Sequence, residues 1–353
     1  MKKLILPLLI SCSIFAQVKV STYSGSKEGG LANGTQSEAK FKGAFGICLD
    51  KKGNLLIAEN GNNIIRKIDA KGNVSTIAGN GKEGNVDGSI ETALFNAPTG
   101  VCADGKGNIY IADFLNHTIR KIHAKGIVTT IAGNGKPGYK NGKGREAQFN
   151  YPRGICIDSK GNIFVGDSWN HRVRKIDSKG NVTTYAGGGS YFNPDSIGKL
   201  VDGKDTTARF FTLCGIACDK NDNIYVADAR NHRIRKIDTD RNVTTIAGSG
   251  GIGVDKGGFV DGKAEISVLN TPTEICAGPN GEIYFSDTYG NRIRKIFKGE
   301  VTTIAGTGKA GNKDGIGSEA EFNFPRGIAV DKTGKKIYVF DYNNNSIRLF
   351  ELN

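Results

Sequence analysis

The apolar residues of this chain alternate with polar residues in short runs, and the runs repeat along the sequence. Six copies of one segment occupy residues 53–68, 107–122, 161–176, 222–237, 281–296 and 335–349. The second copy reads GNIYIADFLNHTIRKI, and the first and last copies are the most degenerate. Alternating β-branched and aromatic positions over about five residues, bounded by Gly and Asn, predict strands rather than helices.

An acidic residue marks the same point of each copy and gives the length of the repeat. These residues are Glu59, Asp113, Asp167, Asp228, Asp287 and Asp341, with spacings of 54, 54, 61, 59 and 54. Each unit holds four predicted strands, which in the third unit cover 154–158, 162–167, 172–177 and 182–187. Four short strands that recur at this period are typical of a propeller blade. We therefore predict an all-β fold, a six-bladed β-propeller of four-stranded antiparallel blades.

The two ends of the repeat series indicate how the ring closes. VSTYSG at 20–25 matches VTTIAG at 128–133, which is the fourth strand of its unit. The chain ends at Asn353, just after a third strand. We predict that the N-terminal strand completes the last blade and closes the ring, because closure removes free sheet edges.

The first residues differ in character from the repeats. Two lysines, an apolar run at 4–10 and small residues before Gln17 are typical of a secretory signal. The predicted domains are a signal peptide at 1–16 and the propeller at 17–353. Leu-Ile-Ser-Cys at 9–12 is also compatible with a lipobox, which would leave a lipid anchor on Cys12. No other stretch approaches the roughly 18 apolar residues of a membrane span, so we expect a secreted or periplasmic protein.

Composition adds two constraints. The formal net charge is +13, which leaves an anionic partner open until the positions of the basic residues are known. Cys48, Cys102, Cys156 and Cys276 share one repeat position, and Ala329 fills it in the sixth unit. A position that takes Cys or Ala indicates a small buried hydrophobe rather than a disulfide partner.

Residues that recur in most units are expected to serve the fold. His117, His171 and His232 share one turn position, and equivalent positions on diverging blades are too far apart to hold one zinc ion. We interpret these histidines as turn residues with local hydrogen bonds. The repeated Asp is interpreted as a turn cap, and the repeated Arg as its partner in hydrogen bonds or ion pairs between blades. Asp87 and the other Asp-Gly pairs are interpreted as turns rather than calcium sites.

The hairpin sequence carries a family resemblance. Asn-His-Arg-Ile-Arg-Lys-Ile after a Tyr-x-Ala-Asp strand, as at 225–237, resembles the NHL-repeat propellers. The resemblance covers nearly all of 18–353, and we expect a secreted bacterial type of this family. It implies the six-bladed fold. For function it implies only a range, since such propellers include binding platforms, receptor domains, RNA binders and a few lyases.

Positions at which one unit departs from the others are more informative about function. Just before each first strand, at the expected mouth of the central channel, the units show Phe45, Thr99, Arg153, Cys214, Thr273 and Arg326. Arg153 and Arg326 belong to opposite blades and are candidates to clamp one anionic group. Glu274 replaces a Gly found in the other five units. Its placement is similar to that of the metal-binding Glu of gluconolactonase-like propellers, which makes it a weak candidate for calcium or zinc and for catalysis.

Aromatic residues complete the set of candidate ligand-binding residues. Phe114, Trp169, Tyr289 and Tyr342 lie at hairpin tips, and Tyr191 and Phe192 lie in one of the two longer linkers. Tips and linkers are expected on one face of the propeller, where long loops commonly carry binding residues. Thr99 and Thr273 join this set because of their place at the channel mouth.

The leading functional hypothesis is an exported, non-catalytic binding or scaffold module. It would bind an extracytoplasmic protein, peptide or glycan on the long-loop face, with no cofactor and as a monomer. The first alternative is a metal-dependent lyase or lactonase-like enzyme with its site at the channel mouth. The second is a nucleic-acid-binding propeller, which export and the placement of the arginines disfavour.

Overall fold

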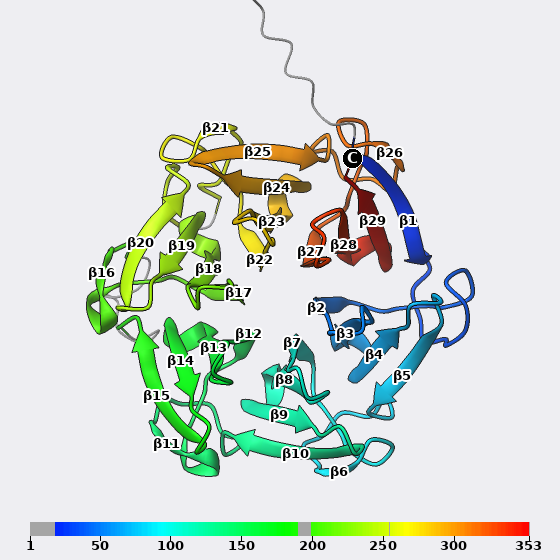
Figure 1. Ribbon diagram of the computed structural model, residues 1–353, viewed down its shortest axis with the longest axis vertical. Helices are drawn as coiled ribbons and strands as arrows, with labels where there is room; N and C mark the ends of the chain where they lie inside the picture. Colours follow the sequence, from blue (N-terminus) through cyan, green and yellow to red (C-terminus); the bar gives the residue numbers. More distant parts are fainter. Residues whose placement is uncertain (1–17, 190–198, 254, 353) are drawn as a thin grey trace, which may run out of the picture.

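The computed structural model describes residues 18–189, 199–253 and 255–352. Six antiparallel sheets surround a central axis, and the first strand of each sheet lies innermost (Figure 1). This confirms the predicted six-bladed propeller. No helix in the described ranges is long and apolar enough to cross a membrane.

The first three blades follow one another along the chain. Blade 1 contains β2 (Ala44–Leu49), β3 (Leu55–Glu59), β4 (Ile64–Ile68) and β5 (Val74–Ala78). Blade 2 contains β7 (Pro98–Ala103), β8 (Ile109–Asp113), β9 (Thr118–Ile122) and β10 (Ile127–Ala132). Blade 3 contains β12 (Pro152–Ile157), β13 (Ile163–Asp167), β14 (Arg172–Ile176) and β15 (Asn181–Ala186).

The last three blades continue the series. Blade 4 contains β17 (Leu213–Cys218), β18 (Ile224–Asp228), β19 (Arg233–Ile237) and β20 (Asn242–Ala247). Blade 5 contains β22 (Pro272–Ala277), β23 (Ile283–Asp287), β24 (Arg292–Phe297) and β25 (Glu300–Ala305). Blade 6 contains β27 (Pro325–Val330), β28 (Lys336–Asp341), β29 (Ser346–Glu351) and the N-terminal strand β1 (Lys19–Gly25).

Short elements occupy the turns and linkers. Single 3-10 turns form the hairpin tips: η1 (Asn60–Asn62), η2 (Phe114–Asn116), η4 (Ser168–Asn170), η6 (Ala229–Asn231), η7 (Thr288–Gly290) and η8 (Tyr342–Asn344). Two more, η3 (Gly144–Glu146) and η5 (Asp205–Thr207), lie in linkers. Two-residue strands from the linkers add a fifth, outermost strand to five blades: β6 (Gly88–Ser89), β11 (Gly142–Lys143), β16 (Gly203–Lys204), β21 (Gly262–Lys263) and β26 (Gly315–Ile316).

The ring closes through the N-terminal strand. β1 pairs antiparallel with β29, with Val20 opposite Phe350 and Lys19 opposite Glu351. On its other side β1 pairs with the short strand β26. The predicted closure is therefore confirmed, and the two ends of the chain are hydrogen-bonded within one blade.

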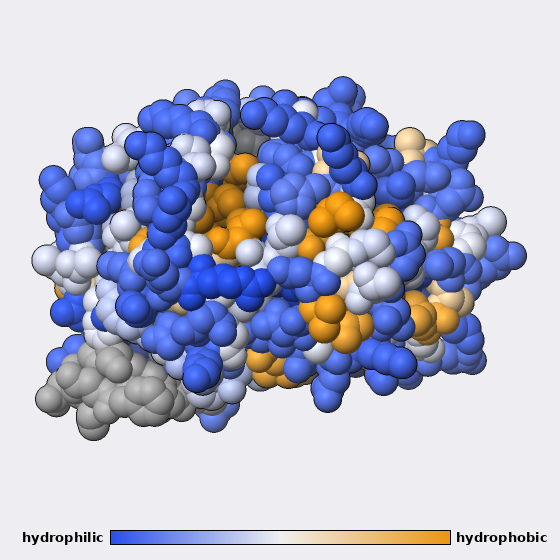
Figure 2. Space-filling model, turned by 90° about the horizontal axis from the view of Figure 1, so that it is seen from below, coloured by the Kyte–Doolittle hydropathy of each residue, from blue (hydrophilic) through white to orange (hydrophobic). Residues whose placement is uncertain are grey.

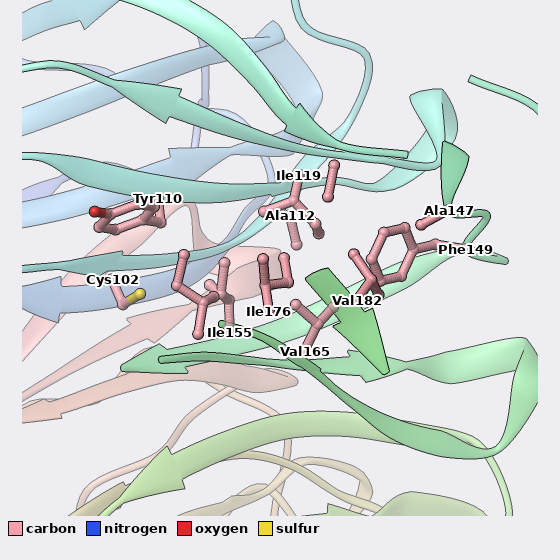
Figure 3. Packing of buried hydrophobic residues seen from close by; sticks show 12 residues of the cluster. Cys102, Tyr110, Ala112, Ile119, Ala147, Phe149, Ile155, Val165, Ile176 and Val182 are labelled. Atoms are coloured by element: carbon pink, nitrogen blue, oxygen red, sulfur yellow. The ribbon is translucent and has the colours of Figure 1, made fainter. Parts of the chain in front are cut away.

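Each blade buries both faces against its neighbours. Figure 3 shows one such core, in which Cys102 and Tyr110 of blade 2 pack with Ile155, Val165 and residues around them in blade 3. The outer rim is mostly hydrophilic, with apolar residues in separate patches (Figure 2). The six cysteines in the described ranges are free thiols, and Cys102 and Cys156 are buried, as expected for small core residues.

A buried ion pair stabilises every blade. In blade 2 an Arg120 nitrogen lies 2.7 Å from the Asp113 carboxylate, and both side chains are fully buried. The guanidinium also donates to the carbonyls of Leu94 and Val86 in the incoming linker, each at 2.8 Å. The equivalent pairs are Arg66–Glu59, Arg174–Asp167, Arg235–Asp228, Arg294–Asp287 and Arg348–Asp341. The expectation of pairs between blades is wrong, because both partners belong to one blade.

The Asp-Gly pairs of the linkers serve the same arginines. Asp87 accepts from Arg120 at 2.9 Å, and Asp202 from Arg235 at 2.6 Å. Asp261 and Asp314 make the corresponding contacts in blades 5 and 6. These carboxylates therefore fix the linkers, in agreement with their interpretation as structural residues.

The histidines and asparagines at the hairpin tips connect each blade to the next. The Nδ1 atom of His117 accepts the backbone N–H of Tyr151 at 3.1 Å, and Asn63 Oδ1 accepts that of Ala97 at 2.8 Å. Four further bonds of this kind complete the ring: His171–Thr212, His232–Thr271, Asn291–Phe324 and Asn345–Gly43. The sequence analysis expected local hydrogen bonds for these histidines, but the bonds link neighbouring blades. Either residue type fits because both tolerate the left-handed backbone found here and offer an acceptor.

Candidate functional site

The first strands of the six blades converge around the axis (Figure 1). The six candidate positions at the channel mouth are the second residues of these strands, not residues before them as the sequence suggested. Tips and linkers lie together on this side, as shown by hydrogen bonds from Leu115 to Asn96 and from Trp169 to Asn150. The candidate residues at the mouth are thus placed on the long-loop face of the propeller.

Arg153 and Arg326 meet over one aromatic ring. The Cζ atom of Arg326 lies 4.0 Å from the ring centroid of Phe45, and that of Arg153 lies 5.5 Å from it. Arg326 also lies 4.6 Å from the Tyr342 ring, and Arg153 lies 5.0 Å from the Phe114 ring. We call these five residues the arginine–aromatic layer. Although they come from different blades, tertiary structure brings them together.

The arginines of this layer lack the partners that the repeated arginines have. Within the described ranges neither guanidinium forms an ion pair with a carboxylate at 4 Å or less. The Nε atoms of both are buried without a hydrogen-bond partner, as they also are in most of the repeated arginines, and Arg153 Nη1 lies 3.5 Å from the Cys214 sulfur. Burial lowers the pKa of Arg326, and the nearby Arg153 charge lowers it further. Aromatic faces stabilise the two cations, but their polar edges remain available.

Glu274 lies next to this layer. A Cβ atom on Gly215 would come within 2.6 Å of Glu274 Oε2, so the side chain covers the neighbouring blade where only Gly fits. Burial raises the pKa of Glu274 to about 8, while the Arg326 and Arg153 charges act in the opposite direction. The carboxyl group is therefore mostly protonated near neutral pH.

The surroundings of Glu274 do not favour a cation. Two guanidinium groups are the charges that act on it. The described residues contain no group of three His, Cys, Asp or Glu side chains that could hold a metal ion. The side chains present therefore do not fit the calcium or zinc site suggested by the placement of Glu274 in the sequence.

Thr99 and Thr273 are buried and already hydrogen-bonded. The Thr99 hydroxyl lies 3.3 Å from the carbonyl oxygen of Arg153 in the next blade. The Thr273 hydroxyl bonds to that of Thr288, which donates to the carbonyl of Pro325 at 2.7 Å. The hydroxyl groups of both threonines are therefore occupied: Thr99 bonds to the next blade, and Thr273 bonds within its own blade to Thr288, which bonds to the next one.

The aromatic candidates fall into separate groups. Trp169 and Phe114 contact the same ring, that of Tyr151, with centroid distances of 4.3 and 4.9 Å. Tyr289 is 54% exposed and contacts Phe324 at 4.9 Å. Tyr342 belongs to the arginine–aromatic layer, 5.9 Å from Phe45. The candidates Tyr191 and Phe192 lie outside the described residues.

Sequence reasoning missed Tyr151 and Phe45 as members of these groups. Tyr151 precedes a Pro-Arg pair and has a positive φ of 53°, which is uncommon for an aromatic residue. The equivalent positions hold Gly43, Ala97, Thr212, Thr271 and Phe324. Comparison of this position between units would have identified the aromatic departure. Phe45 was visible as a departure, but its contact with both arginines depends on ring closure.

A cavity of about 280 Å³ lies along the axis beyond the layer. Its lining includes Glu274 and the equivalent glycines of blades 1 to 3 (Gly46, Gly100 and Gly154), and continues past Cys48, Cys102 and Cys156. The lining does not include Phe45, Arg153 or Arg326. The arginine–aromatic layer thus separates this cavity from the long-loop face. Burial raises the pKa of Cys48 to about 12, so this thiol stays protonated and unreactive.

Known proteins similar to this chain include sequence relatives and solved structures with a similar fold. Protein SUPPRESSOR OF QUENCHING 1, chloroplastic, from Arabidopsis thaliana is 31% identical over 290 residues, which cover 78% of this chain and 27% of that protein. The chain thus spans about a quarter of the length of this relative. An auxiliary nutrient binding protein from Bacteroides thetaiotaomicron has a TM-score of 0.70 at 19% identity, covering 95% of this chain and 76% of that one.

A virginiamycin B lyase from Staphylococcus aureus has a TM-score of 0.55 at 16% identity, covering 96% of this chain and 99% of that one. At such identities the structural likeness shows the fold alone. Four segments match the NHL repeat model, at 95–122, 149–176, 215–237 and 322–350. The chain therefore contains segments that match the NHL repeat, within the fold of a six-bladed β-propeller.

Proposed function

We propose that this propeller is a non-catalytic binding module that takes a glycan, peptide or protein ligand on its long-loop face. The observation that carries this proposal is the pair of stacked arginines at the channel mouth, which no carboxylate neutralises within the described ranges. The repeat needs neither residue, since four other blades have different side chains there. These side chains are not required by the fold and lie together on a rigid face that carries the long loops. This arrangement supports a role in ligand binding.

The aromatic residues beside the mouth support the same proposal. Trp169 and Tyr151 are partly exposed and contact each other, and Tyr151 also contacts Phe114, whose ring lies near Arg153. Aromatic rings next to guanidinium groups are suited to sugars and to anchor residues of a protein partner. The likeness to a solved nutrient binding protein is compatible with this role and with export.

A binding screen with matched variants tests the proposal. The chain is applied to arrays of glycans and of extracellular peptides, and its retained ligands are compared with those of Trp169→Ala. Ile127→Ala is the control, since Ile127 is 46% exposed on the outer strand β10. We expect loss of the retained ligands in Trp169→Ala alone. Equal retention by both variants, or no ligand on either array, would reject a ligand site on this face.

The second candidate is a lactonase-like or lyase activity around Glu274. A buried carboxyl group with a raised pKa is a common feature of general acids, which favours this alternative. Its guanidinium surroundings oppose a metal-dependent version. Elemental analysis of protein purified without chelators tests it. One equivalent of metal that is lost in Glu274→Ala would make the enzymatic function the better supported candidate.

Nucleic-acid binding receives less support. Six arginines of the repeat are fully buried in ion pairs, so they add nothing to an exposed basic surface. The net charge of +13 thus overstates the charge available to a polyanion. A steep fall of affinity with salt for single-stranded RNA would restore this alternative.

A further inference from the structure

The arginine–aromatic layer contains two positive charges with no negative charge bonded to them. The Cζ atoms of Arg153 and Arg326 both lie near the Phe45 ring, so their separation is no more than the sum of their distances to its centroid. Both groups are shielded from water on at least one edge, since each has a buried Nε atom without a partner. A buried polar group without a hydrogen bond is unfavourable, and a buried charge more so. An anion that contacts both groups would relieve both penalties.

The geometry of the stacked guanidinium groups selects the kind of anion. Their Cζ atoms lie over the rings of Phe45, Tyr342 and Phe114, at distances of 4.0 to 5.5 Å from the centroids. Apart from the bond from Arg153 to the Cys214 sulfur, the N–H donors of both groups have no hydrogen-bond partner among the described residues. A planar fork of donors matches two oxygens of one group, as in a carboxylate, phosphate or sulfate.

Glu274 is a third ionisable group beside the two arginines. Its charge interacts electrostatically with both arginines, and among the carboxyl groups of the described residues it is the one that acts on Arg326. The other titratable groups that act on Arg326 or Glu274 are Cys214, Tyr342 and Cys276. When protonated, Glu274 leaves the arginine charge uncompensated and offers an O–H donor.

We propose that Arg153 and Arg326, which lie together at the Phe45 ring beside Glu274, form a binding site for one oxyanion group of the ligand. This inference rests on the proposed function and names the chemical class that the channel mouth recognises. The group is a carboxylate, as in an acidic sugar or a peptide, or a phosphate or sulfate ester. The aromatic tips would then contact the uncharged remainder of the same ligand.

Calorimetric titration of the full chain with sulfate, inorganic phosphate and acetate at constant ionic strength tests the site. We expect saturable binding of one equivalent, weakened about tenfold or more in Arg153→Gln and in Arg326→Gln. Arg145→Gln is the control, since this arginine is 59% exposed and pairs with Asp87 in a peripheral linker. Tighter binding of acetate indicates a carboxylate ligand, and tighter binding of sulfate or phosphate indicates an ester.

A second variant keeps the test informative if the arginine variants unfold. Sulfate keeps its charge between pH 6 and pH 9, whereas Glu274 ionises as pH rises through about 8. Sulfate affinity should therefore fall over this range in the wild type, and stay constant in Glu274→Gln. The proposal is overturned if no anion saturates, if Arg145→Gln loses as much affinity, or if Glu274→Gln shows the wild-type pH dependence. Glycan or peptide binding that persists in that case would leave the proposed function intact.

Discussion

Arginine occupies two environments in this propeller, and the difference separates fold from recognition. Arg174 of β14 is buried and bonded to the carboxylate of Asp167 and to the carbonyls of Gln148 and Lys140. Arg326, at the channel mouth, is also largely buried but has aromatic faces as its neighbours and no carboxylate partner among the described residues. The first environment occurs in all six blades, and the second occurs where two blades depart from the repeat. The arginines that recur in every blade therefore belong to the fold, and the arginines present in only two blades belong to the candidate site.

The largest expected effect is the loss of a repeated arginine. Arg174→Met leaves the buried Asp167 carboxylate without its cation, and removal of one partner of a buried pair costs about 3–5 kcal/mol. Urea unfolding measures the change in the free energy of unfolding. Lys179→Met, in an exposed turn, is the control and should change stability by less than about 0.5 kcal/mol. A loss below about 1 kcal/mol in Arg174→Met would show that the repeated pairs do not hold the blades.

The tip histidines should behave as acceptors that join blades. His117→Ala leaves the Tyr151 backbone N–H without its acceptor and should destabilise by about 1–3 kcal/mol. His117→Asn should retain most of the stability, because Asn occupies this position in three other blades. Thermal unfolding of the two variants checks this contrast. Equal destabilisation would mean that the imidazole ring acts through packing instead.

The same bonds predict a pH effect on stability. Burial lowers the pKa of His171 to about 4, below the unfolded value of 6.5. Because the folded pKa is depressed, the stabilisation is fully present above the unfolded pKa and is lost as pH falls toward the folded pKa. Between about pH 7 and about pH 5.5 the wild type should lose about 1 kcal/mol relative to His171→Asn. A constant difference between the two proteins over this range would contradict the assignment of a neutral acceptor.

The smallest expected effect on stability belongs to the channel mouth. Arg326→Gln removes a buried cation that has no carboxylate partner and lies near Arg153, so the fold loses little. We expect a change within about 1 kcal/mol, in contrast to Arg174→Met. Urea unfolding of both variants under one set of conditions measures the contrast. If Arg326→Gln were as destabilising as Arg174→Met, the mouth arginines would be structural and the comparison would fail.

Much of the fold followed from the sequence because each blade is a local pattern. The copies of 107–122 predicted the strands, the six-bladed ring and the closing role of β1 before any coordinates. The fifth strands of two residues were not predicted, since they carry no alternating pattern of their own. The sequence also did not show that the repeated ion pairs form within a blade rather than between blades, because spacing along the chain does not tell which neighbour a long side chain will reach.

The candidate site was predictable only in part. Comparison of repeat units identified Arg153, Arg326 and Glu274 as departures, and this required no structure. It also selected Thr99 and Thr273, whose hydroxyl groups turn out to be hydrogen-bonded within the protein, to the next blade for Thr99 and to Thr288 for Thr273. Polar residue type alone cannot distinguish a hydroxyl that faces a ligand from one that joins two strands.

The sequence by itself determined the number of blades, their strands and the closure of the ring, because these depend on periodic burial and on turns within about 54 residues. Tertiary structure decided which of the residues that differ between repeat units contact each other. Phe45 and Arg326 are 281 positions apart, yet they are adjacent because closure places blade 6 beside blade 1. It also decided that Glu274 is neutral and that His117 bonds to the next blade. Desolvation and contacts between blades set these properties, and both exist only once the ring has formed.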